Sequence, residues 1–122
     1  MPKTRVVFYR EEDGTVPMVQ WLDGLETKAR AKCVVKLGRL AEFGHELRRP
    51  DADFLRDSIY ELRTHKGHVQ YRMLYFFYGK QAVVVSHGLT KESAIPSMEI
   101  DKVIDRKLRY VNNPSKHMWE ES

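Results

Sequence analysis

Residues 55–88 carry the sequence LRDSIYELRTHKGHVQYRMLYFFYGKQAVVVSHG, and this stretch decides the fold. Three of its segments are rich in β-branched and aromatic residues and are separated by short turn sequences, which predicts strands at about 58–64, 69–78 and 81–88. The middle segment is apolar at both odd and even positions, which indicates a central strand that is covered on both faces. Because the turns are tight, we expect the three strands to pair antiparallel.

The N-terminal part of the chain predicts one strand and two helices. RVVFY at residues 5–9 is a short β-branched and aromatic segment followed by the turn-forming EEDG, which is typical of a strand. Pro17 is suited to the first turn of a helix, and apolar residues follow it at i, i+3, i+4 and i+7 spacing. A second amphipathic helix is expected from Lys28 to about Phe43, with Gly44 at its C-terminal end.

A third helix is expected to begin at Pro96 and to stop at about Asn112. The tail 112–122 is expected to be flexible, although Met118 and Trp119 offer side chains that could dock on the domain. The element order predicts an α+β arrangement: two N-terminal helices packed on a small, mainly antiparallel four-stranded sheet, with a C-terminal helix.

Length and composition favour one globular domain over residues 1–122. With 42% hydrophobic and 31% charged residues, the chain has no apolar segment of about 18 residues that could cross a bilayer. The N-terminus lacks the apolar segment of a secretory signal, so we expect a cytoplasmic protein. The single cysteine, Cys33, excludes an intrachain disulfide and a cysteine-based zinc site, and we expect no metal or other cofactor.

Positive charge is concentrated in the second predicted helix and the loop after it. Residues 28–49 carry seven Lys or Arg and two Asp or Glu, whereas the whole chain has a formal net charge of only +4. Such a patch is suited to a polyanion or an acidic partner, and it is equally the composition of a solvated helix face. The basic residues that we single out here as candidates for binding such a partner are Lys28, Lys32, Lys36, Arg39, Arg48 and Arg49.

Three polar residues interrupt the apolar strands, namely Arg63, Arg72 and His87. The period of two places Tyr60 and Leu62 toward the helices and Arg63 toward the open side of the sheet. The same period places His87 on the face of Val83 and Val85. If the strands are neighbours, the three residues converge with the following Lys91 at one edge of a concave surface. The alternative is structural: each arginine pairs with a carboxylate such as Glu61 or Asp57, and His87 is a hydrogen-bonded, semi-buried residue.

A cluster of this kind suits phosphate chemistry. Arginine offers a planar fork for two phosphate oxygens and lysine a compact charge, and both can stabilise the charge that develops when a ribose 2′-OH attacks phosphorus. A general acid or base would complete the site, and His87 is the first candidate. The other candidates for proton transfer are His65, His68, Lys91 and Tyr78.

The combination LRDSIYELR, YRMLYFF, VVVSHGLTKES and IPSMEIDKVIDRKLRY resembles the phage-derived, HigB-like branch of the RelE/ParE toxin superfamily over nearly the whole chain. The resemblance implies a toxin of a type II toxin–antitoxin pair that binds the ribosome and cuts mRNA without a metal. It also implies a cognate antitoxin with a helix-turn-helix domain. By the same resemblance, Arg72 matches the phosphate-contacting arginine, Arg63 the basic residue of the preceding strand, and Lys91 the basic residue after the last strand.

The resemblance leaves two other functions open. The superfamily includes members that poison a protein target such as DNA gyrase and lack ribonuclease residues, and a fold alone does not separate the two activities. A domesticated phage protein that only binds its antitoxin is the third reading. Glu61 also occupies a position where RelE-type enzymes often have a basic residue, so the site assignment depends on where these side chains lie.

Overall fold

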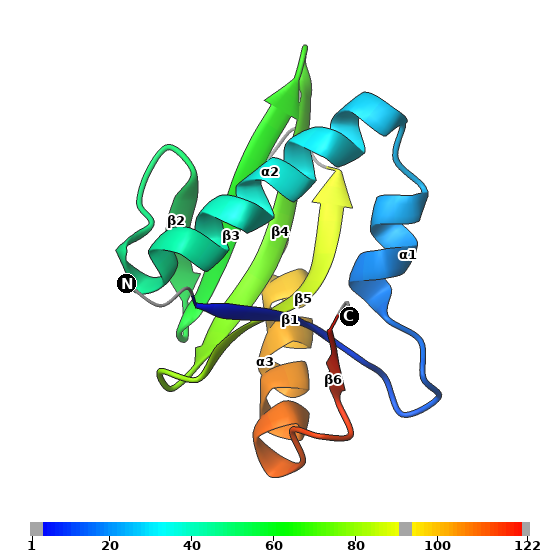
Figure 1. Cartoon of the computed structure of the whole chain (residues 1–122), viewed down its shortest axis with the longest axis vertical. Helices are drawn as coiled ribbons and strands as arrows, with labels where there is room; N and C mark the ends of the chain where they lie inside the picture. The colour runs from blue at the N-terminus through cyan, green and yellow to red at the C-terminus, as the bar shows by residue number, and fades with distance from the viewer. Residues whose placement is uncertain (1–3, 91–93, 121–122) are drawn as a thin grey trace.

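The computed structural model describes residues 4–90 and 94–120, which form one mixed sheet with helices on both of its faces (Figure 1). Six strands are present in this part of the chain, in the spatial order β2-β3-β4-β5-β1-β6. The elements in chain order are β1 (Arg5–Tyr9), α1 (Pro17–Asp23), α2 (Thr27–Phe43), the 3-10 helix η1 (Gly44–Glu46), β2 (Ala52–Arg56), β3 (Ile59–Lys66), β4 (Val69–Tyr78), β5 (Ala82–Thr90), α3 (Ser97–Asn112) and β6 (Met118–Trp119).

The expected four-stranded, mainly antiparallel sheet under two N-terminal helices is wrong. The sheet has six strands and is mixed, because β1 lies parallel to β5. Its helices are a short α1, a central α2 and a C-terminal α3. The strand that the sequence did not predict inside the domain is β2, which pairs antiparallel with β3 through a two-residue turn at Asp57 and Ser58. Both turn residues have positive φ, 52° and 64°, as a tight hairpin of this length requires.

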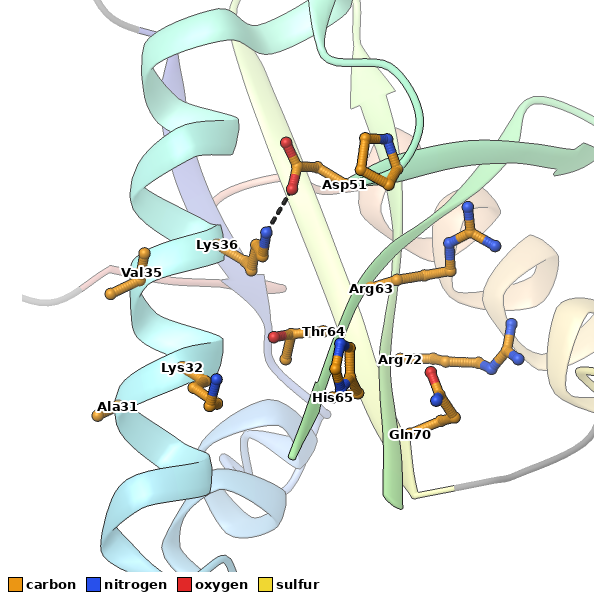
Figure 2. A pocket seen from close by; sticks show the side chains of 11 residues that line it. Ala31, Lys32, Val35, Lys36, Asp51, Arg63, Thr64, His65, Gln70 and Arg72 are labelled. Carbon is orange, nitrogen blue, oxygen red and sulfur yellow. Dashed lines mark hydrogen bonds and ion pairs between the residues drawn. The ribbon is translucent and has the colours of Figure 1, made fainter. Parts of the chain in front are cut away.

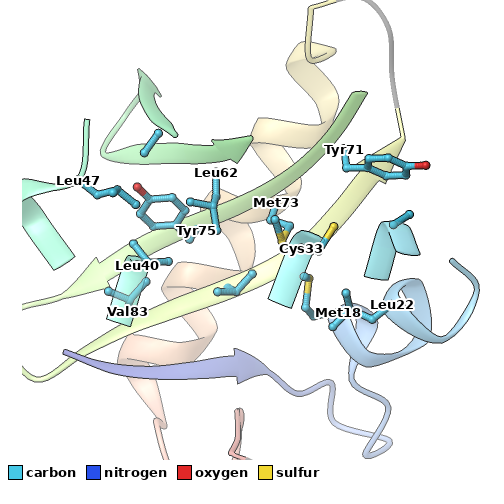
Figure 3. Close-up of a cluster of buried hydrophobic side chains, with 13 residues drawn as sticks. Met18, Leu22, Cys33, Leu40, Leu47, Leu62, Tyr71, Met73, Tyr75 and Val83 are labelled. Atoms are coloured by element: carbon cyan, nitrogen blue, oxygen red, sulfur yellow. The ribbon is translucent and has the colours of Figure 1, made fainter. Parts of the chain in front are cut away.

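The three strands predicted from residues 55–88 are present as β3, β4 and β5, and they pair antiparallel in that order. Tyr71, Met73 and Tyr75 of β4 enter a core shared with α1 and α2, which Figure 3 shows. Leu74 and Phe76 enter a second core under α3. The central strand is therefore covered on both faces, as its continuous apolar sequence predicts.

A β-bulge in β5 changes the face on which His87 lies. Leu74 of β4 pairs with His87, but the next residue, Tyr75, pairs with Val85, so Ser86 is an extra residue in β5. His87 consequently shares the α3 face with Leu74, while Val83 and Val85 pack in the core under α1 and α2. The expectation that His87 shares a face with Val83 and Val85 is wrong, because the bulge interrupts the period of two.

The C-terminal segment contacts the N-terminal strand. Met118 and Trp119 form β6, which pairs antiparallel with β1, and the Trp119 ring stacks on Phe8 with a centroid distance of 5.5 Å. Arg5 and Glu120 add an exposed ion pair of 2.7 Å. Of the two expectations for this tail, docking through Met118 and Trp119 is the one that agrees with the structure.

No helix within residues 4–90 and 94–120 has the length and apolar composition needed to span a membrane.

Two glycines offer a matched test of the packing between α1 and the sheet. A Cβ added to Gly88 of β5 would lie 2.1 Å from Cε3 of Trp21, whereas one added to Gly38 of α2 would meet no atom within 4 Å. We expect Gly88→Ala to lower the free energy of unfolding by about 1–3 kcal/mol through overpacking. Gly38→Ala should raise it by up to about 1 kcal/mol through helix propensity. Urea unfolding of both variants measures this, and a neutral Gly88→Ala would contradict the close approach.

Candidate functional site

A cleft opens beside the sheet edge where β3 extends beyond β2 (Figure 2). β2 pairs with β3 only as far as Leu62, whose partner is Ala52. Beyond Leu62, β3 is therefore an open edge of the sheet, and this edge lies next to α2. The cleft has a volume of about 640 Å³. We call it the arginine cleft, and its walls are Ala31, Lys32, Val35 and Lys36 of α2, Pro50 and Asp51, Arg63, Thr64 and His65 of β3, and Gln70 and Arg72 of β4.

Arg63 and Arg72 lie directly opposite each other on β3 and β4. Figure 2 shows both guanidinium groups on the side of β3 that is turned away from α2. A single carboxylate, Glu61, lies between them and is only 3% exposed. Nη1 of Arg72 donates to both of its oxygens, at 3.1 and 3.0 Å, while Nε of Arg63 lies 3.6 Å from Oε1. One positive charge of the three-residue group therefore stays uncompensated by Glu61.

Arg72 has donors that the described residues do not use. Its Nε is buried, and no hydrogen-bond partner for this atom exists within residues 4–90 and 94–120. Buried donors are almost always paired in native structures, so an unpaired one at the wall of a cleft points to a missing acceptor. A guanidinium that is held at one end by Glu61 and has donors to spare is suited to bind an anionic oxygen.

The three lysines of α2 and its Arg39 divide into two groups. Lys36 and Arg39 both bind Asp51, which is 8% exposed: Nζ of Lys36 donates to Oδ1, and Nε of Arg39 donates to Oδ2 at 3.0 Å. The hydrogen bond from Lys36 is the main reason why the pKa of Asp51 is lowered. Lys28 and Lys32 are exposed and form no ion pair with the described residues. Lys32 is thus the α2 residue that brings an unneutralised charge to the cleft.

Arg48 and Arg49 do not line the arginine cleft. Arg48 donates through Nη1 to the carbonyl oxygens of His45 and Leu47. Arg49 is paired with Asp53 at 2.9 Å but keeps 75% of its side chain exposed. Both arginines lie at a second hollow, on the other side of the segment that leads into β2.

His87 is buried under α3, away from the walls of the arginine cleft, and is only 7% exposed. Nη1 of Arg106 donates to Nδ1 at 3.0 Å, and because arginine is only a donor, Nδ1 must be the acceptor. Nε2 then carries the proton and donates to Oε1 of Glu99 at 2.9 Å, while Oγ of Ser86 lies 2.8 Å from Nδ1. Burial lowers the pKa of His87 to about 4, with the charge of Arg106 acting in the same direction, so the imidazole is neutral at pH 7.

The other residues considered for proton transfer are in different places. His65 is exposed and lines the arginine cleft together with the two arginines. His68 lies in the turn after β3, and Tyr78 lies at the far end of β4, where its ring packs edge-to-face on Tyr110. Lys91 lies outside the residues that the structure describes. Of the histidines, His65 is therefore the one that the fold places beside Arg63 and Arg72.

Some of these residues carry a sequence signal and others do not. Glu99, Val103 and Arg106 are four and three residues apart, so the helical period puts the two charged side chains on the buried stripe of α3. That pattern could have identified the partners of His87. Asp51 follows Pro50 in a segment without any period, and nothing in its sequence context indicates that it binds two residues of α2. Within residues 4–90 and 94–120, no group of three or more His, Cys, Asp or Glu is placed to hold a metal ion.

The ion pair between Arg72 and Glu61 should contribute strongly to stability. Arg72→Ala leaves a buried carboxylate without its main partner, which should cost about 3–5 kcal/mol of unfolding free energy. Adding Glu61→Gln removes the unpaired charge, so the double variant should recover part of that loss. Urea unfolding at pH 7 measures both, and a cost below about 1 kcal/mol for Arg72→Ala would show that the carboxylate is satisfied without Arg72.

The buried, neutral His87 predicts a loss of stability in acid. Its pKa in the folded protein, about 4, lies below its ordinary value of 6.5, so the unfolded chain takes up the proton first as the pH falls. Neutral His87 contributes fully to the free energy of unfolding above pH 6.5. This contribution is lost as the pH falls toward 4, by about 3 kcal/mol in all. His87→Gln keeps an acceptor and a donor but does not titrate. Its unfolding free energy should fall less steeply than that of the wild type over this range, and equal slopes would contradict the assignment.

A comparison with models of known protein families gives a match to this chain. The family model described as phage-derived protein Gp49-like (DUF891) matches residues 20–108, which run from α1 into α3 and include every wall of the arginine cleft. None of the curated proteins compared with the chain matches it. The Gp49-like family is RelE-like, which supports the resemblance at the level of the superfamily, whereas the HigB-like branch stays a prediction. The chain belongs to the Gp49-like family of phage-derived proteins.

Proposed function

We propose that this protein is the toxin of a type II toxin–antitoxin pair and that it inhibits translation by cutting mRNA on the ribosome without a metal. The observation that carries the proposal is the pair of arginines at directly opposed positions of β3 and β4, with one carboxylate between them. Like charges directly opposite each other destabilise a sheet, and Glu61 compensates only one of the two arginine charges, so the second needs a further reason. An anionic phosphate bound in the cleft is such a reason.

In the proposed reaction, the ribose 2′-OH attacks the adjacent phosphorus and the bond to the 5′ oxygen of the next nucleotide breaks. Negative charge develops on the phosphoryl oxygens, and the guanidinium groups of Arg63 and Arg72 stabilise it. Lys91, which lies outside the described residues, is expected to add a further positive charge. His65 is the residue best placed to move a proton, because imidazole is suited to this role near neutral pH.

The geometry supports a different role for His87 from the acid or base that the sequence suggested. Both of its ring nitrogens are engaged, and α3 covers it. We assign it to positioning: it holds Glu99 and Arg106, and thereby α3, on the face of the sheet that also carries Glu61, Arg63 and Arg72.

The basic surface would hold ribosomal RNA. Phosphate contacts dominate such binding and do not require base recognition. Lys28 and Lys32 are the best placed because their charges are not neutralised by a described carboxylate. The further contributors in this proposal are Lys36, Arg39, Arg48 and Arg49. A helix-turn-helix antitoxin is the expected partner and the cytoplasm the expected location.

Arg63→Ala tests the proposal with little damage to the fold, because it leaves the bond between Arg72 and Glu61 in place. We expect induction of the wild type, in cells without the antitoxin, to produce discrete cuts within translated codons. Arg63→Ala should reduce them about 100-fold, as the loss of one donor to a developing oxyanion typically does. Primer extension on cellular mRNA after brief induction measures the cuts. Arg109→Ala is the control, because Arg109 is an exposed α3 arginine that pairs with Asp105 one helical turn away.

Two outcomes would contradict the proposed nuclease activity. Growth arrest without cuts, unchanged by Arg63→Ala, would show a toxin that acts on a protein target such as gyrase. No arrest at all would show a protein that retains only binding of its antitoxin. Cuts that persist in Arg63→Ala at the wild-type level would remove this arginine from the site.

A further inference from the structure

A second hollow lies beside the arginine cleft and is lined in part by residues of β2, the edge strand of the sheet. Its volume is about 650 Å³. We call it the aromatic hollow, and it is lined by His45, Leu47, Arg48, Arg49, Ala52, Asp53, Phe54 and Tyr60. The proposed reaction uses none of its aromatic side chains.

Phe54 is the unusual residue of this surface. It lies on the edge strand, and 55% of its side chain is exposed. It is nevertheless held in place: it packs edge-to-face on Tyr60 at 5.3 Å, and Tyr60 stacks on the buried Tyr75 at 5.5 Å. An exposed aromatic ring that rests on further aromatic rings is a rigid, flat apolar surface, and nucleobases stack on surfaces of this kind.

A second exposed ring lies in the same hollow. The imidazole of His45 stacks on Phe77 with a centroid distance of 3.6 Å and an angle of 17° between the ring planes. Phe77 in turn packs edge-to-face on Tyr60 at 5.2 Å. Rings from η1, β2, β3 and β4 thus form one connected aromatic layer, whose outer members are His45 and Phe54.

The charge of the hollow favours a polyanion. Arg48 and Arg49 are both exposed, and the one carboxylate among the lining residues, that of Asp53, pairs with Arg49, which leaves one excess positive charge in the hollow. Bonds to the carbonyl oxygens of His45 and Leu47 hold the Arg48 guanidinium beside the aromatic layer. Aromatic rings interleaved with arginines are the combination that binds single-stranded nucleic acid, because the rings take the bases and the arginines take the phosphates.

The hollow adjoins the arginine cleft along the segment that leads into β2. Arg49 lines the aromatic hollow, and the next two residues, Pro50 and Asp51, line the arginine cleft. The two depressions therefore share one segment of chain as their common wall. A strand of RNA with its scissile phosphate at Arg63 and Arg72 would reach the aromatic hollow by crossing this wall.

We propose that the aromatic hollow is a base-stacking subsite for single-stranded RNA, which rests on the proposed function for the position of the cut. A nucleobase of the bound strand lies on the ring of Phe54, and Arg48 and Arg49 contact the phosphates that flank this base. Stacking accepts every base, so the subsite adds affinity and fixes the position of the strand without selecting a sequence.

A fluorescent base reports stacking directly. The probe is a single-stranded decamer of nine uridines and one central 2-aminopurine, with 2′-O-methyl sugars so that it cannot be cut. Binding to the wild type should quench the 2-aminopurine. Phe54→Leu keeps an apolar side chain but removes the ring, so it should bind the probe about 5- to 150-fold more weakly and abolish the quench at saturation. Leu108→Ala is the matched control, because it removes a 68% exposed apolar side chain from α3 and should change neither value.

The proposed subsite is contradicted if binding to the wild type leaves the 2-aminopurine fluorescence unchanged. It is also contradicted if Phe54→Leu quenches this fluorescence as strongly as the wild type does. Cuts in cellular mRNA that depend on Arg63 would still support the proposed nuclease in either case. If the quench depends on Phe54 but no cuts appear in cells, the stacking subsite stands and the nuclease fails. The two experiments therefore separate the failure of one proposal from the failure of the other.

Discussion

The carboxylate of Glu61 allows the sheet to keep two arginines face to face. Without it, Arg63 and Arg72 would be an uncompensated like-charge pair on adjacent strands. With it, Arg72 is fixed by two hydrogen bonds while one positive charge remains available at the cleft. The register of β3 and β4 depends on the same arrangement, since a slip of one residue would turn a guanidinium into the core under α2. Glu61 thus links the pairing of the central strands to the charge of the site.

The extra residue Ser86 determines which part of the sheet can act as a site. Its bulge moves His87 to the face under α3, where Glu99 and Arg106 bind it and the helix closes over the strand. That helix and the pair α1 and α2 leave neither face of β4 open. The cleft lies instead at the edge of the sheet, where β3 extends beyond β2. The strand sequences predict a functional surface on an open face of the sheet. The structure has a cleft at the edge of the sheet instead.

The sequence predicts the elements that have a period and misses those that do not. β3, β4, β5, α2 and α3 follow from apolar spacing and from Gly and Pro at their ends. β2 lacks a clean alternation and β6 is only two residues long, so neither has a pattern to detect. The parallel pairing of β1 with β5 joins distant segments, which local spacing does not encode. The tight turn between β3 and β4 predicts correctly that Arg63 and Arg72 lie together. The bulge in β5 is not predicted, and it separates His87 from the two arginines.

Contacts on both sides hold the segment between the arginine cleft and the aromatic hollow. These contacts fix the position of the two depressions relative to each other. Asp51 binds Lys36 and Arg39 of α2 through its side chain, and its carbonyl oxygen accepts a 2.7 Å hydrogen bond from the backbone N–H of Arg63. The wall therefore cannot move without breaking contacts to α2 and to β3. Asp51 binds two cations of α2 and compensates one of their two positive charges, so it weakens the basic patch while it fixes the spacing between the paired arginines and the aromatic layer. For the proposed binding of single-stranded RNA, this fixed spacing would limit the bound strand to one register.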